Sequence, residues 1–288
     1  MTDAGAGTGA GGATGGGAVE ATEEDWFSAN RAMWDERVPI HVGSEFYGVE
    51  EFKAGRSTLH PFEVAEVGPV RDRELVHLQC HFGLDTLSWA REGARVTGLD
   101  FSEPAVEAAR TIADECAIPA RFVSANVYDA LEVLDHRYDV VYVNVGALNW
   151  LPDVWRWAEI VAELLRPGGR LYLRESHPVA DVFADEELTV AYDYFADPEP
   201  LTWEDAGTYA DADAATQHNR SFEWQHPVSE VLSAVLGQGL HLDLFHEQPF
   251  TVYARWPFLE RHDDGTFWMP EDRPVLPLMY TLRATKVG

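Results

Sequence analysis

The chain has 288 residues, 46% of them hydrophobic, and a formal net charge of -28 from 49 acidic residues against 21 lysines and arginines. This length and apolar content fit an α/β domain with insertions or two small domains. The negative charge disfavours nucleic acid or anionic lipid as the main partner, because each would repel an acidic surface. No apolar run approaches the roughly 20 residues that a membrane span requires, so no membrane association is expected.

The chain begins with a glycine- and alanine-rich segment, residues 1–19, which is typical of a flexible tail. A GxGxxG pattern at residues 7–12 resembles a dinucleotide-binding loop, but it has that meaning only between a strand and a helix, and neither is predicted there. The segment lacks the basic and apolar regions of a signal peptide. The cysteines, Cys80 and Cys116, have no zinc-ligand spacing, so we expect a reduced, cytoplasmic protein without a metal.

Residues 22–37 have the spacing of an amphipathic helix, with Trp26, Ala29 and Met33 on one face. A polar and aromatic stretch follows, and then a short helix is predicted near residues 61–67.

From Glu74 the pattern becomes regular. The predicted strands are 75–79, 95–99, 121–124, 139–145 and 170–175, and the helices between them are 84–92, 103–116 and 153–165. Ser102 is placed to cap the second helix, and Pro167-Gly168-Gly169 ends the third. Strands that alternate with helices in this way predict a mainly parallel sheet covered on both faces.

After Glu175 this rhythm breaks, and an acidic and aromatic segment follows at 178–226. In order, we predict short strands at 190–195 and 220–226, a helix at 227–236, and paired strands at 240–248 and 278–286, with an irregular surface excursion at 256–277. We interpret the chain as one domain with insertions.

The loop at residues 79–83 follows the first regular strand, where open α/β sheets bind their ligands. Asp100 follows the second strand, and an acid there can accept both hydroxyls of an adenosine ribose. A dinucleotide would also use such an acid, but its pyrophosphate needs a loop with several glycines. Gln79, His81 and Phe82 would crowd a pyrophosphate. The loop therefore favours a ligand that contains adenosine but no phosphate.

From about Glu74 to Pro178 the sequence resembles class I S-adenosylmethionine-dependent methyltransferases. The matching segments, in order, are "VHLQCHFGLDTLSWA", "VTGLDFS", "FVSANVYD", "YDVVYVNVGALNWLPD" and "LLRPGGRLYLRESHP". The first motif of that family usually has an acid and three glycines. Here His77, Gln79 and His81 stand at the acid and the first two glycines, and "LQCHFGLDTLSWA" is a recurring variant of the motif.

The resemblance implies a Rossmann-like, doubly wound α/β fold. Its mostly parallel seven-stranded sheet would have an antiparallel C-terminal strand, and an insertion would roof the pocket. The expected parts of a single domain, residues 20–288, are an N-terminal lid region at 20–70, a cofactor-binding core at 74–178, a substrate-side insertion at 179–226, and a C-terminal helix with a strand pair at 227–288.

The cofactor implied by the resemblance is S-adenosyl-L-methionine, with S-adenosyl-L-homocysteine as the product. The residues expected to hold it lie at the ends of the first four strands. They are Asp100 for the ribose, Phe101, Asn126 and Val127 for the adenine, and Gln79, His81, Gly83, Asn144 and Gly146 for the methionine part.

Methyl transfer mainly requires alignment of the acceptor with the methyl group, and a general base helps when the acceptor carries a proton. His177, after the fifth strand, is the candidate base because its ordinary pKa suits proton removal near neutral pH. Glu175 is its rival, although a buried carboxylate there could equally anchor a loop. Tyr47 is expected to close over the cofactor as part of the lid.

The acceptor is expected to contact residues from the lid, the end of the fourth strand and the insertion, namely His41, Asn149, Trp150 and Tyr192. The sequence thus predicts a methyltransferase that acts on a small molecule, with oxygen, nitrogen and carbon all open as the attacking atom and no oligomeric state implied. Two alternatives are an enzyme of this fold that uses the same cofactor for a non-methylating reaction such as cyclisation, and a non-catalytic protein that binds the cofactor.

Overall fold

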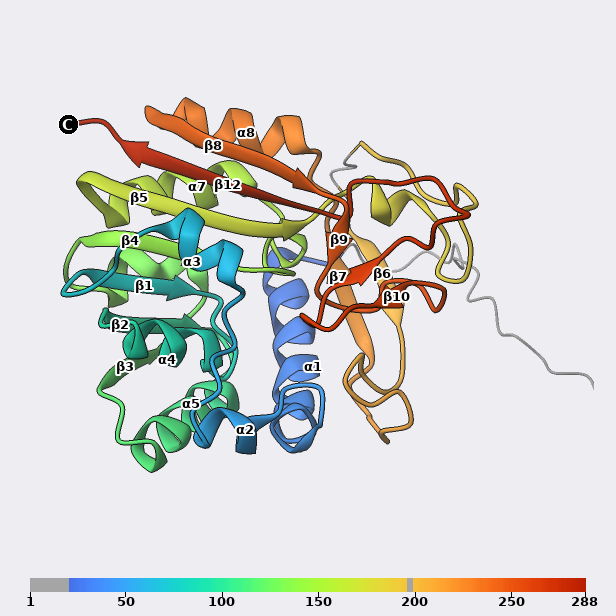
Figure 1. Cartoon of the computed structure of the whole chain (residues 1–288), viewed down its shortest axis with the longest axis horizontal. Helices are drawn as coiled ribbons and strands as arrows, with labels where there is room; N and C mark the ends of the chain where they lie inside the picture. The colour runs from blue at the N-terminus through green and yellow to red at the C-terminus, as the bar shows by residue number, and fades with distance from the viewer. Residues whose placement is uncertain (1–20, 196–198) are drawn as a thin grey trace, which may run out of the picture.

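The computed structural model describes residues 21–195 and 199–288, so the predicted tail at 1–19 and its GxGxxG pattern lie outside the described residues. At the centre is a seven-stranded sheet with the order β3-β2-β1-β4-β5-β12-β8 (Figure 1). Its strands are β1 (Glu74–Leu78), β2 (Arg95–Asp100), β3 (Ala120–Ser124), β4 (Tyr138–Val143), β5 (Leu165–Ser176), β8 (Leu240–Gln248) and β12 (Met279–Lys286). β12 runs antiparallel to both neighbours, β5 and β8, whereas the other pairs are parallel. The predicted Rossmann-like fold is confirmed.

Helices cover both faces of this sheet, as parallel strands require (Figure 1). One face carries α3 (Pro61–Val67), α4 (Leu84–Arg91) and α5 (Glu103–Glu115). The other face carries α7 (Val154–Leu164) and α8 (Val228–Gly237). The predicted cap of α5 is present, because the Ser102 hydroxyl accepts a hydrogen bond from the Ala105 N–H at 3.3 Å. Shorter helical turns are α6 (Ala130–Val133), η1 (Val127–Asp129), η2 (Leu148–Trp150) and η3 (Ala180–Val182).

The first helix, α1 (Glu23–Gly43), stands across the carboxyl ends of the sheet strands (Figure 1). It continues beyond the predicted end at residue 37 despite Pro39, because the next turn buries Val38 and His41. The predictions missed the short helix α2 (Val49–Lys53) that follows. None of the helices in the described part of the chain combines the length and apolar character needed to cross a bilayer.

A β-hairpin from the insertion packs on α1. It consists of β6 (Leu201–Glu204) and β7 (Arg220–Glu223). Asn30 on α1 makes two 2.8 Å hydrogen bonds with the backbone of Phe222. The strand predicted at 220–226 is confirmed for residues 220–223. The strand predicted at 190–195 is wrong, since the segment makes only an isolated bridge at Val190. β6 pairs with β7 in its place.

The segment predicted as irregular, 256–277, holds regular pairing. β9 (Phe250–Thr251), β11 (Phe267–Trp268) and β10 (Glu260–Arg261) form a small three-stranded sheet. Trp256 is fully buried in a cluster with Met269, Leu278 and Ala180. Packing of this small core places the segment over the carboxyl edge of the main sheet, where the hairpin also lies (Figure 1). The prediction failed because these strands are too short to show a sequence period.

Candidate functional site

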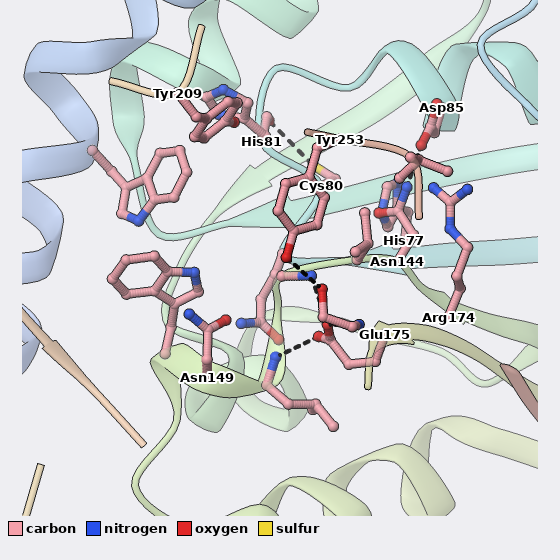
Figure 2. Close-up of a pocket in the computed structure, with 18 of the residues that line it drawn as sticks. His77, Cys80, His81, Asp85, Asn144, Asn149, Arg174, Glu175, Tyr209 and Tyr253 are labelled. Atoms are coloured by element: carbon pink, nitrogen blue, oxygen red, sulfur yellow. Dashed lines mark hydrogen bonds between the residues drawn. The ribbon is translucent and has the colours of Figure 1, made fainter. Parts of the chain in front are cut away.

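A cavity of about 1160 Å³ lies between the carboxyl ends of the main strands and the segments added around them. Most of the residues predicted for the site line it together. They are Tyr47, Gln79, His81, Gly83, Asp100, Phe101, Asn126, Val127, Asn144, Gly146, Asn149, Trp150, Glu175 and Tyr192. His41 and His177 lie outside the wall of the cavity. In Figure 2 one side of the cavity shows His77, Asp85, Asn144 and Arg174, and the other shows Tyr209 and Asn149.

The loop at 79–83 has a left-handed backbone at three positions, as glycine-rich loops do, although it has only one glycine. Gln79, His81 and Gly83 have φ values of 56°, 51° and 77°. This left-handed conformation costs a non-glycine residue on the order of 1 kcal/mol. A Cβ atom at Gly83 would in addition lie 2.6 Å from the ring of Phe122. Side chains are therefore accommodated at 79 and 81, and only position 83 has no room for one.

Asp100 is held at the end of β2 by two backbone donors. Its carboxylate accepts hydrogen bonds from the His81 N–H at 2.7 Å and the Ser102 N–H at 3.0 Å. The residue is 6% exposed, and this burial raises the pKa of the carboxyl group to about 6. Asp100 therefore presents a carboxylate to the cavity at neutral pH, beside Phe101.

His77, at the position of the usual family acid, is bound inside the protein. Its Nδ1 lies 2.8 Å from the Thr86 hydroxyl and its Nε2 lies 2.9 Å from Asn144 Oδ1. The Asn144 amide donates in turn to Asp85. Burial lowers the pKa of His77 to about 4, so the ring is neutral. His77 thereby orients Asn144 at the end of β4.

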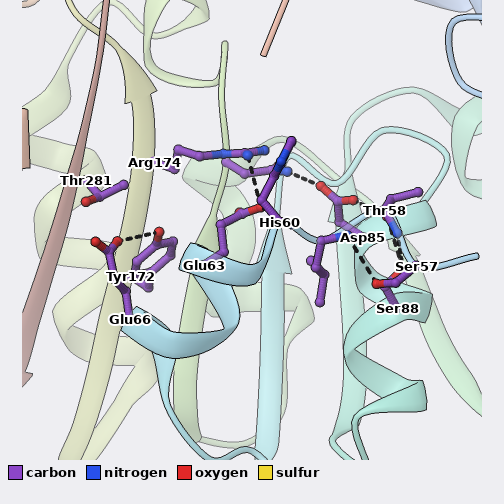
Figure 3. A network of polar contacts seen from close by, with 12 residues as sticks. Ser57, Thr58, His60, Glu63, Glu66, Asp85, Ser88, Tyr172, Arg174 and Thr281 are labelled. Carbon is purple, nitrogen blue, oxygen red and sulfur yellow. Dashed lines mark hydrogen bonds and ion pairs between the residues drawn. The ribbon is translucent and has the colours of Figure 1, made fainter. Parts of the chain in front are cut away.

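A buried ion pair supports the same side of the cavity (Figure 3). Arg174 on β5 is 4% exposed and lies 2.9 Å from Glu63 on α3, which is fully buried. Glu63 also accepts a 2.7 Å hydrogen bond from the Tyr142 hydroxyl. Burial raises the pKa of Glu63, whereas the Arg174 charge opposes this rise. The predictions missed this pair, although a charged residue among the apolar positions of a strand or helix is a usable signal.

The N-terminal segment meets the insertion above the loop. The hydroxyl groups of Tyr47 and Tyr209 are hydrogen-bonded to each other. Behind them, His41 contacts His81 Nε2 at 2.9 Å and the Thr208 hydroxyl at 2.5 Å. Burial lowers the pKa of His41 to about 4. Both ring nitrogens of His41 are therefore engaged, and the substrate contact predicted for it is corrected to an internal bridge between lid, loop and insertion.

The two predicted general bases face different surroundings. Glu175 lies in the cavity wall, but its oxygens accept hydrogen bonds from the N–H groups of Gly146, Ala147, Leu148 and Ser176 at 2.7 to 2.9 Å. This arrangement supports the alternative of a loop anchor. His177 is corrected as well: its Nε2 lies 3.0 Å from Glu247 on β8, and its Nδ1 accepts from the Val179 N–H. The side chain thus packs against the sheet instead of facing the cavity.

The side of the cavity away from the loop is aromatic and acidic, and the predictions missed most of it. Asp181, Glu223, Tyr253, Trp203 and Trp224 line it. They come from four separate segments of the last 110 residues, so no local motif unites them. In Figure 2 the Tyr253 side chain reaches toward the end of β5, where its hydroxyl lies 3.2 Å from the Ser176 hydroxyl.

Known proteins match the core of the chain in sequence. Residues 76–171 match the family model described as "Methyltransferase domain". The ubiquinone biosynthesis O-methyltransferase of Photorhabdus laumondii is 32% identical over 105 residues, which are 36% of this chain and 43% of that protein. The protein of the same name from Vibrio cholerae is 33% identical over 100 residues, 35% of this chain and 40% of that protein. The chain thus spans less than half the length of these curated relatives.

Solved structures match more of the chain. The CcbJ methyltransferase from Streptomyces caelestis has a TM-score of 0.58 at 17% identity and covers 89% of this chain and 98% of its own. An S-adenosylmethionine-dependent methyltransferase from Mesorhizobium loti has a TM-score of 0.54 at 20% identity, with coverages of 81% and 99%. At these identities the likeness shows the fold. With the sequence match to the core, it confirms the predicted resemblance to class I methyltransferases: residues 76–171 match a methyltransferase domain in sequence, and the chain has the fold of S-adenosylmethionine-dependent methyltransferases.

Proposed function

We propose that the whole chain is an enzyme that transfers the methyl group of S-adenosylmethionine to a small molecule bound in the same cavity. The observation that carries this proposal is the cavity itself. Pockets for one drug-sized ligand measure roughly 300–1,000 Å³. The cavity of about 1160 Å³ has the loop on one side and aromatic side chains on the other, which supports binding of cofactor and acceptor together.

On the cofactor side, each residue has a proposed role that its position supports. Asp100 would accept the ribose hydroxyls, and Phe101 would pack on the adenine, flanked by Asn126 and Val127. Gln79, His81, Gly83, Asn144 and Gly146 would enclose the methionine part. Because the Gln79 amide also donates to the Ala147 carbonyl at 2.7 Å, the loop after β1 and the loop after β4 would move as one wall.

Methyl transfer mainly requires alignment of the acceptor with the methyl group. The bound cofactor supplies a sulfonium methyl group that is already reactive toward nucleophiles. The protein contributes by closing the site through the Tyr47–Tyr209 contact and by holding the 146–148 backbone with Glu175. Such preorganisation excludes water and keeps the acceptor in line with the methyl group.

The acceptor is proposed to lie against Asn149, Trp150 and Tyr192. The curated relatives are named for O-methylation, but the stretch that matches the family model ends at residue 171. The insertion and the C-terminal excursion that line the acceptor side lie beyond it. We therefore propose that Asn149 and Trp150 inside the matched core contact the acceptor, and that its identity depends mainly on the segments outside that core.

Calorimetric titration with S-adenosylhomocysteine tests the cofactor half of the proposal. We expect micromolar binding by the wild type and a tenfold to hundredfold loss for Asp100→Asn, since a charged hydrogen-bond acceptor contributes about 1.5–3 kcal/mol. Glu103→Gln, an exposed acid nearby, is the control and should bind like the wild type. Wild-type affinity should also fall below pH 6, because Asp100 becomes protonated there. No binding by the wild type would overturn the proposal.

Product analysis separates the two alternative functions. A methyltransferase leaves S-adenosylmethionine almost unchanged until an acceptor is added. Conversion of the cofactor alone would indicate an intramolecular reaction such as cyclisation. Binding without turnover of any small-molecule acceptor would indicate a non-catalytic protein.

A further inference from the structure

We infer that the acceptor is a protonated amine and that Asp181 is the carboxylate that receives its proton before methyl transfer. This inference rests on the proposed function and names the substrate class of the same cavity. It depends on where Asp181 lies, on the charges around it, and on the aromatic side chains that line the cavity with it.

Asp181 follows β5 in the short helix η3 and lines the cavity. Its side chain is 44% exposed, and its nearest cation is Arg255, whose Nε lies 3.8 Å from Oδ1. Arg255 is already engaged, since it donates to Asp185 at 2.9 Å and to the Phe183 carbonyl at 3.0 Å. Within residues 21–195 and 199–288, no group donates a hydrogen bond to the Asp181 carboxylate. That carboxylate is therefore open to a ligand.

The charges that face Asp181 are mostly negative. The cavity walls around the carboxylate partly remove its hydration, and this desolvation is the largest cause of a rise in its pKa to about 7. Arg255 lowers the pKa, whereas Glu175 at the end of β5 and Glu223 on β7 raise it further. Tyr253 is a further titratable neighbour, and Asp181 helps to raise the pKa of its hydroxyl.

The other carboxylates accept hydrogen bonds from the protein, whereas Asp181 has the longer ion pair with Arg255. Glu175 accepts hydrogen bonds from four backbone N–H groups. Glu223 accepts a 3.1 Å hydrogen bond from the Asn149 amide. With Asp185, which pairs with Arg255 at 2.9 Å, four carboxylates share one guanidinium. This end of the cavity is therefore favourable for a cation and unfavourable for a phenolate or carboxylate. An amine would thus be recognised by Asp181, the acid that remains available.

Aromatic side chains supply the rest of the wall. The aromatic residues that line the cavity are Trp150 on η2, Tyr192, Trp203 on β6, Trp224 and Tyr253. Aromatic faces attract cations by roughly 0.5–2 kcal/mol each and also pack against flat apolar groups. The combination of an open carboxylate and aromatic faces matches an amine carried on an apolar or aromatic body.

The ammonium group R–NH₃⁺ transfers one proton to the Asp181 carboxylate and becomes a neutral amine. The nitrogen lone pair forms a bond to the methyl carbon while the carbon–sulfur bond breaks, and that electron pair stays on sulfur to leave S-adenosylhomocysteine. The product is R–NH₂⁺–CH₃, and Asp181 later releases its proton to solvent. A carboxylate with a raised pKa is a better proton acceptor for this step than one with an ordinary pKa.

The first experiment measures binding to the complex of the protein with S-adenosylhomocysteine. Phenethylamine, phenethyl alcohol and 3-phenylpropionate serve as cationic, neutral and anionic probes at pH 7.5. We expect the amine to bind at least tenfold tighter than either of the others. Asp181→Asn should remove this preference while leaving S-adenosylhomocysteine affinity unchanged. Asp185→Asn, a matched acid that contacts the same Arg255 but is 77% exposed, should retain it.

The second experiment follows turnover with S-adenosylmethionine on a panel of small amines and matched phenols. We expect amines to react, and the wild-type rate to rise with pH around 7. This pH dependence should be absent in Asp181→Asn and partly restored in Asp181→Glu. Equal or tighter binding of the alcohol or anion, no discrimination among the three probes, or methylation of phenols alone would overturn the inference. If S-adenosylhomocysteine itself fails to bind, the proposed function fails first; if it binds without charge discrimination, only the inference fails.

Discussion

The charged groups on the two sides of the cavity differ in how far the protein itself pairs them. On the side of β1 and β4, Glu63 is paired with Arg174, and Asp100 accepts hydrogen bonds from two backbone N–H groups. On the opposite side, Asp181 has only a guanidinium at 3.8 Å and is turned to the cavity. Charges that the protein satisfies itself hold its shape, whereas a charge left open is available to a ligand. Substitutions on the two sides should therefore have different consequences.

The largest effect is expected at the buried ion pair. Glu63→Gln leaves the Arg174 guanidinium buried without its partner, which should lower the free energy of unfolding by about 3–5 kcal/mol. Denaturant-induced unfolding measures this change. Asp135→Asn removes an acid from an exposed pair with Arg121 and should change the stability little. Similar losses for both variants would contradict the structural role of the buried pair.

A smaller effect is expected at Glu175, which lies where the two sides meet. In Glu175→Gln an amide NH₂ replaces one oxygen, so two backbone N–H groups lose their acceptor at about 1–2 kcal/mol each. The 146–148 backbone should loosen, and S-adenosylhomocysteine should bind more weakly by calorimetry. Unchanged stability together with lost turnover would instead identify Glu175 as a base.

The smallest effect is a pH dependence on the cofactor side. Burial lowers the pKa of His77 to about 4 from an ordinary value of 6.5, so the unfolded chain binds more protons than the folded one between these pH values. Stability from neutral His77 is therefore complete above pH 6.5 and declines as the pH falls toward 4. At pH 5 the loss is on the order of 1–2 kcal/mol. Thermal unfolding at pH 7 and pH 5 should show a smaller decrease for His77→Gln than for the wild type; an equal decrease would exclude His77 as its source.

Much of the core could be read from the sequence because its signals are local. Strand and helix periods, the Ser102 cap and the Pro167-Gly168-Gly169 turn each lie within a few residues. The position of Asp100 follows from the end of β2, since parallel strands present their carboxyl ends at one edge. The loop at 79–83 was readable for the same reason, although its left-handed backbone at Gln79 and His81 was not.

The sequence by itself thus determined the sheet, its helices and the residues placed at the strand ends. Only the tertiary structure decided which way the candidate side chains turn: His177 toward β8, His41 on α1 toward His81, and Asp181 into the cavity. It also decided that Glu63 meets Arg174 across 111 residues. Periodicity reports which face of an element is apolar, but a polar partner from a distant segment is selected only when burial brings the segments together and makes an unpaired charge costly.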